Sequence, residues 1–477
     1  MKLKGLFLSV YMALTLLMFI TFKTSILVWI SFFVSSLILL LITIYHLYYE
    51  KKYSPFLSAY IVFSFLFFLA APVSQINSFY GVEDPKFVNF FPFKEGSIYY
   101  ANLLICVFNI IFIFSYLYFK KRLKNYIPKA IINKNQKHLP FTILIILGLS
   151  FLVFFGSIQF VQDEFSRPSW VKSPNSVATL LVWKKFLFMI PFAGIILCFQ
   201  YFKKDNKIKG NLINIILFLS LFTLLIIWFK NPFTEKRNAL GPIYLSIIFL
   251  AIPKLFNTNL KTLSFLFFVM IIVFPLSAII THSDATFIEI YYNPIILIQQ
   301  MKGGGVSDAF NTLNYDAFGN IMATIDYVQK FGFSYGYQLL GGVLFFIPRA
   351  FWTTKPYSSG QVIGEHLIND FGFGFSNLSN PLVSESFINF GWIGVLVFPV
   401  ILAYVFIQMI KWLQSKNYLK KTMAFYFAMH LIFLLRGDFT NGFSYYISPL
   451  IIVLFLPKFI EILTKEYLIY AKRKKIN

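Results

Sequence analysis

The sequence holds few of the residues that build cofactor, nucleotide or metal sites. It has only two cysteines, Cys106 and Cys198, and both lie within apolar runs, so neither a disulfide framework nor a cysteine-ligated metal is available. There is no Asp-x-Asp pair, no His-Glu-x-x-His helix, no P-loop and no glycine-rich nucleotide fingerprint. Four of the five histidines lack metal-ligand spacing: His46, His138, His282 and His430. We therefore expect no cofactor and no metal ion.

Acidic residues are also scarce, with 19 Asp and Glu against 42 Lys and Arg and a net charge of +23. Such a charge can indicate nucleic-acid binding, but here the lysines form short clusters between apolar runs, as the positive-inside rule expects. The hydrophobic fraction of 58% exceeds that of a soluble chain, which is about 45–50%. We therefore exclude a nucleic-acid partner and expect a membrane protein.

Apolar runs of spanning length recur along the whole sequence. Roughly 20 apolar residues cross the hydrocarbon core, and each crossing is helical because lipid cannot satisfy open backbone groups. The first run follows Lys2 and Lys4 without a small-residue cleavage site, which indicates an uncleaved span. The twelve predicted spans are 6–22, 25–49, 56–73, 100–119, 141–161, 177–202, 212–229, 242–256, 263–280, 387–410, 423–435 and 445–460.

The positive charges predict the orientation of these spans. With the N-terminus inside, the cytoplasmic segments hold 27 of the 42 lysines and arginines, although the outer segments are much longer. The preference for Lys, Ile, Phe and Asn over Arg and Ala suggests an AT-rich bacterial genome. We therefore expect a multi-pass protein of the bacterial cytoplasmic (inner) membrane with both termini in the cytoplasm.

One predicted outer loop, residues 281–386, is far longer than the others, and its length marks it as functional. Gly303, Gly304 and Gly305 predict a hinge within it. The stretch 337–347 predicts an amphipathic helix that lies on the membrane or folds over the bundle. The predicted domains are the first nine helices (1–280), this loop (281–386), the last three helices (387–460) and a basic cytoplasmic tail (461–477).

The six arginines are distributed unevenly. Four of them fall in predicted outer loops, whereas the inner loops carry lysine almost exclusively. Arginine presents a rigid fork of donors that matches phosphate, which the lysine ammonium does not. The distribution therefore indicates an anionic, phosphorylated ligand at the outer face. The four outer arginines are Arg167, Arg237, Arg349 and Arg436.

The most distinctive outer string is 347–360, where two prolines and a glycine stiffen an exposed loop. Arg349 and Lys355 offer two cations in it, and Trp352 is a candidate interface anchor. The loop is suited to grip a diphosphate at headgroup level. The alternatives are a lipid-headgroup anchor and a salt bridge within the loop.

Two further arginines lie at predicted span ends. Arg237 belongs to the turn Glu235-Lys236-Arg237, which is either a second phosphate contact or an ordinary charge cluster that Glu235 neutralises. Arg436 precedes Gly437 and Asp438, and an arginine at a span end is costly unless it is paired or solvated. Asp438 is the expected partner of Arg436, and the alternative is an arginine that lines the same outer cavity.

Sugar transfer to a hydroxyl requires a general base, and a carboxylate or an imidazole can serve. Glu385 lies directly before a predicted span, where partial desolvation favours the base role. His366 is the second candidate. Each of the acids is otherwise interpreted as a solvated loop charge: Asp316, Asp326, Glu365, Asp370 and Glu385.

Several of these strings resemble the bacterial oligosaccharide repeat-unit polymerases, the Wzy-type O-antigen and capsule polymerases. The first is Pro-Arg-x-x-Trp-x-x-Lys-Pro at 348–356, with ten residues between Arg349 and Gly360 as in some members. The second is Ser-Glu-Ser-Phe-Ile-Asn-Phe-Gly-Trp-Ile-Gly at 384–394, and Arg436-Gly437-Asp438 is similar to the family's C-terminal end. The charged turn at Arg237 departs from the glycine-flanked arginine expected there.

The resemblance implies an all-α polytopic membrane protein of about twelve transmembrane helices, with one long extracytoplasmic loop that carries short amphipathic helices, similar to GT-C glycosyltransferases. It implies polymerisation of undecaprenyl-diphosphate-linked oligosaccharide units into O-antigen or capsular polysaccharide at the outer face. The diphosphate is itself the leaving group, so the transfer would be inverting and metal-independent. The implied diphosphate ligands are Arg237, Arg349, Lys355 and Arg436, with Glu385 or His366 as base. The implied partners are the lipid-linked oligosaccharide, membrane lipids and a chain-length regulator protein.

Three other functions fit parts of the sequence. A flippase for lipid-linked oligosaccharides suits twelve spans, and Lys184 and Lys185 within the sixth span favour it, but the two halves of the chain are unlike. An O-antigen ligase would share the topology and substrate class and differ in its acceptor. A structural partner of a polysaccharide export complex is disfavoured only by the placement of the arginines.

Overall fold

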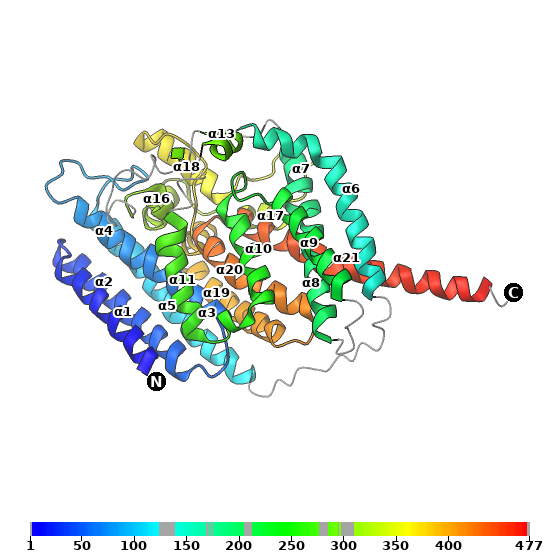
Figure 1. Cartoon of the computed structure of the whole chain (residues 1–477). Coiled ribbons are helices and arrows are strands. Elements are labelled where there is room, and N and C mark those ends of the chain that lie inside the picture. Colours follow the sequence, from blue (N-terminus) through cyan, green and yellow to red (C-terminus); the bar gives the residue numbers. More distant parts are fainter. Residues whose placement is uncertain are drawn as a thin grey trace.

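The computed structural model describes residues 2–123, 139–167, 171, 173, 175–204, 212–275, 285–293, 295–296 and 310–474. These residues form helices and connections, without a β-strand among them (Figure 1). The expected all-α polytopic fold is confirmed, because eight helices are long and apolar enough to cross a membrane. They are α1 (Lys2–Ile20), α2 with η1 (Ile26–Tyr49), α3 with η2 and α4 (Pro55–Ser78), α5 (Glu95–Leu123), α6 (Leu139–Phe165), the interrupted helix from α7 to α8 (Val177–Phe202), α19 (Leu382–Leu413) and α21 (Phe439–Lys474).

The other four predicted spans form helices that are shorter or more polar. Three of them are apolar but short: α9 (Leu212–Phe229), α10 (Arg237–Ala251) and α11 with η8 (Asn259–Val273). The fourth, α20 (Tyr418–Arg436), carries two lysines and an arginine, and it is buried from Thr422 to Ile432. Because protein surrounds α20 over those turns, its sequence need not be uniformly apolar. Eight of the twelve predicted spans therefore have the length and hydropathy of a membrane crossing, and the rest are helices of the interior or short apolar helices.

The long segment before α19 is built into the bundle. Its longest described helix, α16, is buried throughout Ala317–Ile325, where it packs against α5, α18 and α19. The predicted amphipathic stretch is helical over Tyr337–Val343, and the predicted glycine hinge at 303–305 lies outside the described residues. In Figure 1 this segment occupies the end of the bundle away from the N-terminus. Its helices are α13 (Phe287–Tyr292), α16 (Ala317–Phe331), α17 (Tyr337–Val343) and α18 (Ser359–Phe371).

The string at 384–394 forms the first part of α19 and contains a sharp break. Gly391 has φ 56° and ψ −138° inside the helix, a conformation that L-residues rarely adopt. A Cβ at Gly394 would lie 1.9 Å from the carbonyl oxygen of Ser386, so this position also excludes a side chain. The two glycines allow the sharp break in α19 directly after its first turns. Those turns are buried and carry Glu385.

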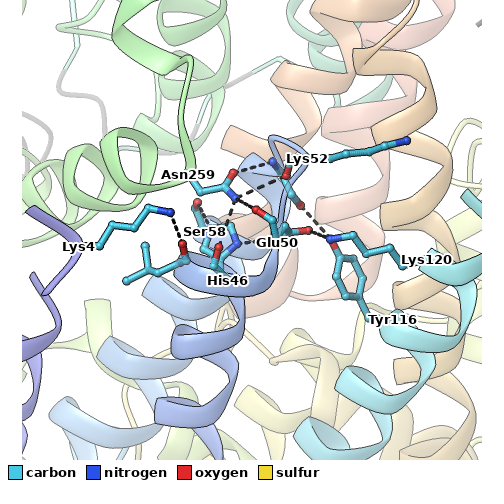
Figure 2. A network of polar contacts seen from close by, with 10 residues as sticks. Lys4, His46, Glu50, Lys52, Ser58, Tyr116, Lys120 and Asn259 are labelled. Carbon is cyan, nitrogen blue, oxygen red and sulfur yellow. Dashed lines mark hydrogen bonds and ion pairs between the residues drawn. The ribbon is translucent and has the colours of Figure 1, made fainter. Parts of the chain in front are cut away.

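A buried polar network joins five helical segments near the N-terminus (Figure 2). Its centre is Glu50, which accepts hydrogen bonds from Tyr116 and Lys120 of α5 and lies 2.5 Å from Nδ1 of His46. The second ring nitrogen of His46 lies 2.7 Å from the hydroxyl of Ser58 in α3. Because each charged or polar group here has a partner, the network offsets the cost of burying them. Further contacts come from Lys4 of α1, which donates to the carbonyl of Leu47, and from Asn259 of α11, which donates to the carbonyl of His46.

Replacing Glu50 with Ala should destabilise the protein, because it leaves Lys120 and His46 without their buried partner. Removal of one member of a buried ion pair costs about 3–5 kcal/mol. We expect a clearly lower thermal unfolding midpoint in detergent for Glu50→Ala. The exposed Glu83 provides the control, and Glu83→Ala should unfold like the parent protein. Equal midpoints for the two variants would contradict the structural role of the network.

Candidate functional site: a half-buried arginine pair

Arg237 and Arg436 are far apart in the sequence and come together in the structure. Arg237 is the first residue of α10, and Arg436 is the last residue of α20, which packs along α10. Arg436 acts electrostatically on Arg237, and both act on the hydroxyl of Tyr315. Burial raises the pKa of Tyr315, and the two guanidinium groups oppose that rise. The fold thus brings together two of the four expected diphosphate ligands.

The guanidinium group of Arg237 is held without an acidic partner among the described residues. Its Nη1 donates to the carbonyl oxygen of Phe274 at 2.8 Å, and its Nη2 donates to Oδ1 of Asn314 at 3.0 Å. The ring of Phe274 lies 4.1 Å from the guanidinium carbon. These neutral contacts fix the orientation of Arg237 and leave its positive charge uncompensated.

Arg436 is held by the same segment. Its Nη2 donates to the carbonyl oxygen of Leu313 at 2.7 Å and lies 3.1 Å from Oδ1 of Asp316, which is only 2% exposed. Its buried Nε has no hydrogen-bond partner among the residues that the structure describes. Within the described part of the chain, Asp316 is the one carboxylate at ion-pair distance from either arginine. Two positive charges therefore face one negative charge, and an anion that binds here would balance the excess.

Two pairings expected from the sequence are wrong. Asp438 does not pair with Arg436, because its carboxylate accepts hydrogen bonds from the backbone and side-chain nitrogens of Asn441, each at 2.8 Å. It thus caps the start of α21, and burial raises its pKa. The described ion pairs of Glu235 are with Lys184 at 2.9 Å and the more distant Lys230 at 3.7 Å, rather than with the adjacent residues of its own turn. At these two positions, sequence neighbours were therefore poor guides to the charge partner.

The cations of the 347–360 loop bind the loop itself. Arg349 donates to the carbonyl oxygens of Lys355 and Pro356, and its guanidinium carbon lies 4.2 Å from the centre of the Tyr357 ring. Lys355 donates to the carbonyl oxygens of Phe345 and Ile347, each at 2.9 Å. Burial and the nearby Arg349 lower the pKa of Lys355. The expectation that these two residues bind diphosphate stays a prediction, and in the structure they hold the shape of their loop.

That loop ends where α18 meets the break between α20 and α21. A Cβ on Gly360 would lie 2.1 Å from the carbonyl oxygen of Leu378. Only glycine therefore allows α18 to pack this closely against the backbone at Leu378. Beside it, the carboxylate of Glu385 accepts hydrogen bonds from Ser359 and from the backbone nitrogen of Phe439. Glu385 is 2% exposed. Through its hydrogen bonds with Ser359 and Phe439 it connects α19 to α18 and to the turn after Arg436.

The two expected bases lie in different places. Glu385 contacts Phe439, three residues after Arg436 in the chain. His366 lies on α18 with its Nε2 2.9 Å from Oδ2 of Asp326 in α16. Asp326 is ten residues beyond Asp316 along the chain, about 15 Å of helix. Glu385 is therefore the candidate that contacts the turn following Arg436.

The lysines of the sixth span are engaged inside the protein. Lys184 lies 2.5 Å from Glu164 and also pairs with Glu235, and Arg167 pairs with Glu164. Lys185 donates to the hydroxyl of Ser444 at 2.6 Å. A lysine within the sixth span was the feature that favoured a flippase. For Lys184 it is explained by the ion pairs with Glu164 and Glu235.

Sequence reasoning missed the residues that position the arginines. Asn314 and Tyr315 were not singled out, and Asp316 was considered only as a candidate base. The only available signal was a short polar stretch directly before the amphipathic α16, which is a weak one.

The fold defines a multi-pass, all-helical membrane protein with a cationic site held between a long intervening segment and the ends of two helices. In comparisons with known proteins, residues 359–467 match the family model described as O-antigen polysaccharide polymerase Wzy. The resemblance noted in the sequence is confirmed over this part, and it supports a role in O-antigen polysaccharide polymerisation. The match contains Gly360, Glu385 and Arg436 and does not extend to Arg237 or Arg349. No curated protein and no solved structure matches the chain.

Replacing Gly360 with Ala should disrupt the junction at α18, because the added carbon would collide with the Leu378 carbonyl. We expect reduced thermal stability and loss of polymer formation. Gly374 is the matched control, since a Cβ there meets no heavy atom within 4 Å. Similar behaviour of Gly360→Ala and Gly374→Ala would show that the close approach at Gly360 is unimportant.

Proposed function

We propose that this protein polymerises undecaprenyl-diphosphate-linked oligosaccharide units at the outer face of the bacterial cytoplasmic membrane. The proposal places both termini in the cytoplasm and the arginine pair towards the outer leaflet. The observation that carries it is the excess positive charge at Arg237 and Arg436, because a diphosphate supplies the missing negative charge. The family match over the C-terminal region supports the same reaction class.

In the proposed reaction, a hydroxyl of the incoming unit attacks the anomeric carbon of the growing chain. The new carbon–oxygen bond forms as the bond to the lipid diphosphate breaks, and the diphosphate leaves with the electron pair. Arg237 and Arg436 stabilise the charge that develops on it, so no metal ion is required at the reacting atoms. Glu385 takes the hydroxyl proton, which requires its carboxylate to exchange the hydrogen bond from Ser359 for one from the acceptor.

The rigid fork of arginine is essential to this proposal, so Arg237→Lys and Arg436→Lys are the informative variants. Loss of one preorganised donor to a developing charge lowers the rate by about 100- to 1,000-fold. Purified protein in liposomes, supplied with lipid-linked repeat units, should give a ladder of products that both variants lose. Arg122→Lys is the control, because Arg122 is exposed and stacks on Tyr118.

The same assay separates the alternatives. A polymerase gives a ladder, a ligase gives one transfer to a different acceptor, and a flippase gives transport without a new glycosidic bond. A normal ladder in both Arg237→Lys and Arg436→Lys would contradict the proposed role of the pair.

Arg349 is proposed to act through its loop. Arg349→Ala removes the two bonds that close the loop onto the carbonyls of Lys355 and Pro356, so long polymer should be lost while membrane insertion is retained. If the loop is the cause, limited proteolysis should cut the variant faster near 349–357. Resistance to proteolysis together with a raised KM for the lipid-linked substrate would instead indicate direct phosphate binding by Arg349.

A further inference from the structure

A second cluster of ionisable groups lies away from the arginine pair, between α16 and α18. His366 is at its centre: its Nε2 is 2.9 Å from Oδ2 of Asp326, and its Nδ1 is 3.2 Å from Oδ2 of Asp370. Lys330 reaches the same two oxygens, at 3.0 Å from Asp326 and 2.7 Å from Asp370. Each helix contributes two residues at a spacing of four, so each pair shares one helix face.

The donor groups of this cluster are partly unsatisfied. His366 is 4% exposed, and its buried Nδ1 lies near Asp370 but makes no hydrogen bond of normal geometry to any described residue. The rings of Tyr327, Phe331 and Phe371 surround the imidazole, with centroids 5.6–6.0 Å away, and hold its plane in position. An oriented and buried imidazole nitrogen beside two carboxylates is the donor arrangement of many metal sites.

If the imidazole of His366 is counted as neutral, the charges of the cluster do not sum to zero. Two carboxylates face one ammonium group, which leaves one negative charge. A divalent cation in place of the ammonium group would cancel both carboxylate charges, and Lys330, whose side chain is 44% exposed, can swing into solvent.

We propose that Asp326, His366 and Asp370 form a binding site for a divalent transition-metal ion, with Lys330 as an internal competitor. One ligand atom from each of the three residues lies within 4.8 Å of the others, which is close enough to share one ion. A nitrogen with two carboxylate oxygens suits Zn²⁺ or Mn²⁺ better than Mg²⁺, which prefers oxygen ligands alone. Water would complete the coordination on the exposed side, at Asp370.

The site's position assigns it a structural role. It joins α16 to α18, and the opposite ends of these helices hold Asp316 and the Ser359–Gly360 junction. Asp326 is about 15 Å of helix from Asp316, too far for the ion to touch the diphosphate. A bound ion would therefore stiffen the two supports of the arginine pair without entering the reaction.

The test uses tag-free, full-length protein in detergent, treated with a chelator and then titrated with ZnCl₂, MnCl₂ or MgCl₂ in a calorimeter. We expect one saturable Zn²⁺ or Mn²⁺ site per chain, and a higher thermal unfolding midpoint once it is filled. Asp370→Asn should weaken binding at least tenfold. Lys330→Gln should strengthen it about tenfold, because the competing ammonium group is gone.

The Lys330→Gln variant is expected to bind the metal ion more tightly. A gain in affinity cannot be caused by poor folding, so this variant tests the proposal even if Asp370→Asn folds poorly. Glu83→Gln, an exposed acid outside the cluster, should bind as the parent protein does. Absence of saturable binding in both the parent protein and Lys330→Gln would overturn the proposal. Equal metal affinities of the Lys330→Gln variant and the Lys330→Gln, Asp370→Asn double variant would also overturn it.

Discussion

A charge inside a helical bundle of low polarity must be balanced nearby, and this constraint shapes most of the described interior. Glu50 pairs with Lys120 and lies beside His46, and Glu235 pairs with Lys184 and Lys230. At Arg237 and Arg436 the described residues leave the balance incomplete. An uncompensated charge that is partly removed from water is costly, so such a place is suited to bind a molecule of opposite charge.

The helical fold could be predicted from hydropathy and spacing alone, because each span must satisfy its own backbone. The lengths of the interior helices could not, since a helix such as α20 is surrounded by protein that the sequence does not reveal. The charge partners also escaped prediction. Arg436 was expected to pair with Asp438, two residues away, and it pairs with Asp316 instead. Pairing across such separations depends on tertiary packing, which no local pattern records.

The strings that carried the resemblance hold the scaffold together in this structure. Gly360 and Gly391 permit a close approach and a sharp break, and Arg349 closes its own loop. The arginine at 237, which was the least typical of the expected site residues, lies instead beside Arg436. A recognisable string can therefore mark backbone geometry as well as site groups, because Arg436 belongs to one of these strings, whereas Arg237 comes from a less distinctive position.

The dependence of Arg436 on a segment far upstream has a consequence for biogenesis. Arg237, the first residue of α10, is synthesised before α20 and therefore before its neighbour Arg436. Until then its charge must stay near the lipid headgroups or water. The segment with Asn314 and Asp316 emerges later, and α20 follows it, so the cationic site can assemble only when most of the chain has been made. Chains interrupted before α20 would therefore present a half-built site to the quality-control proteases of the membrane.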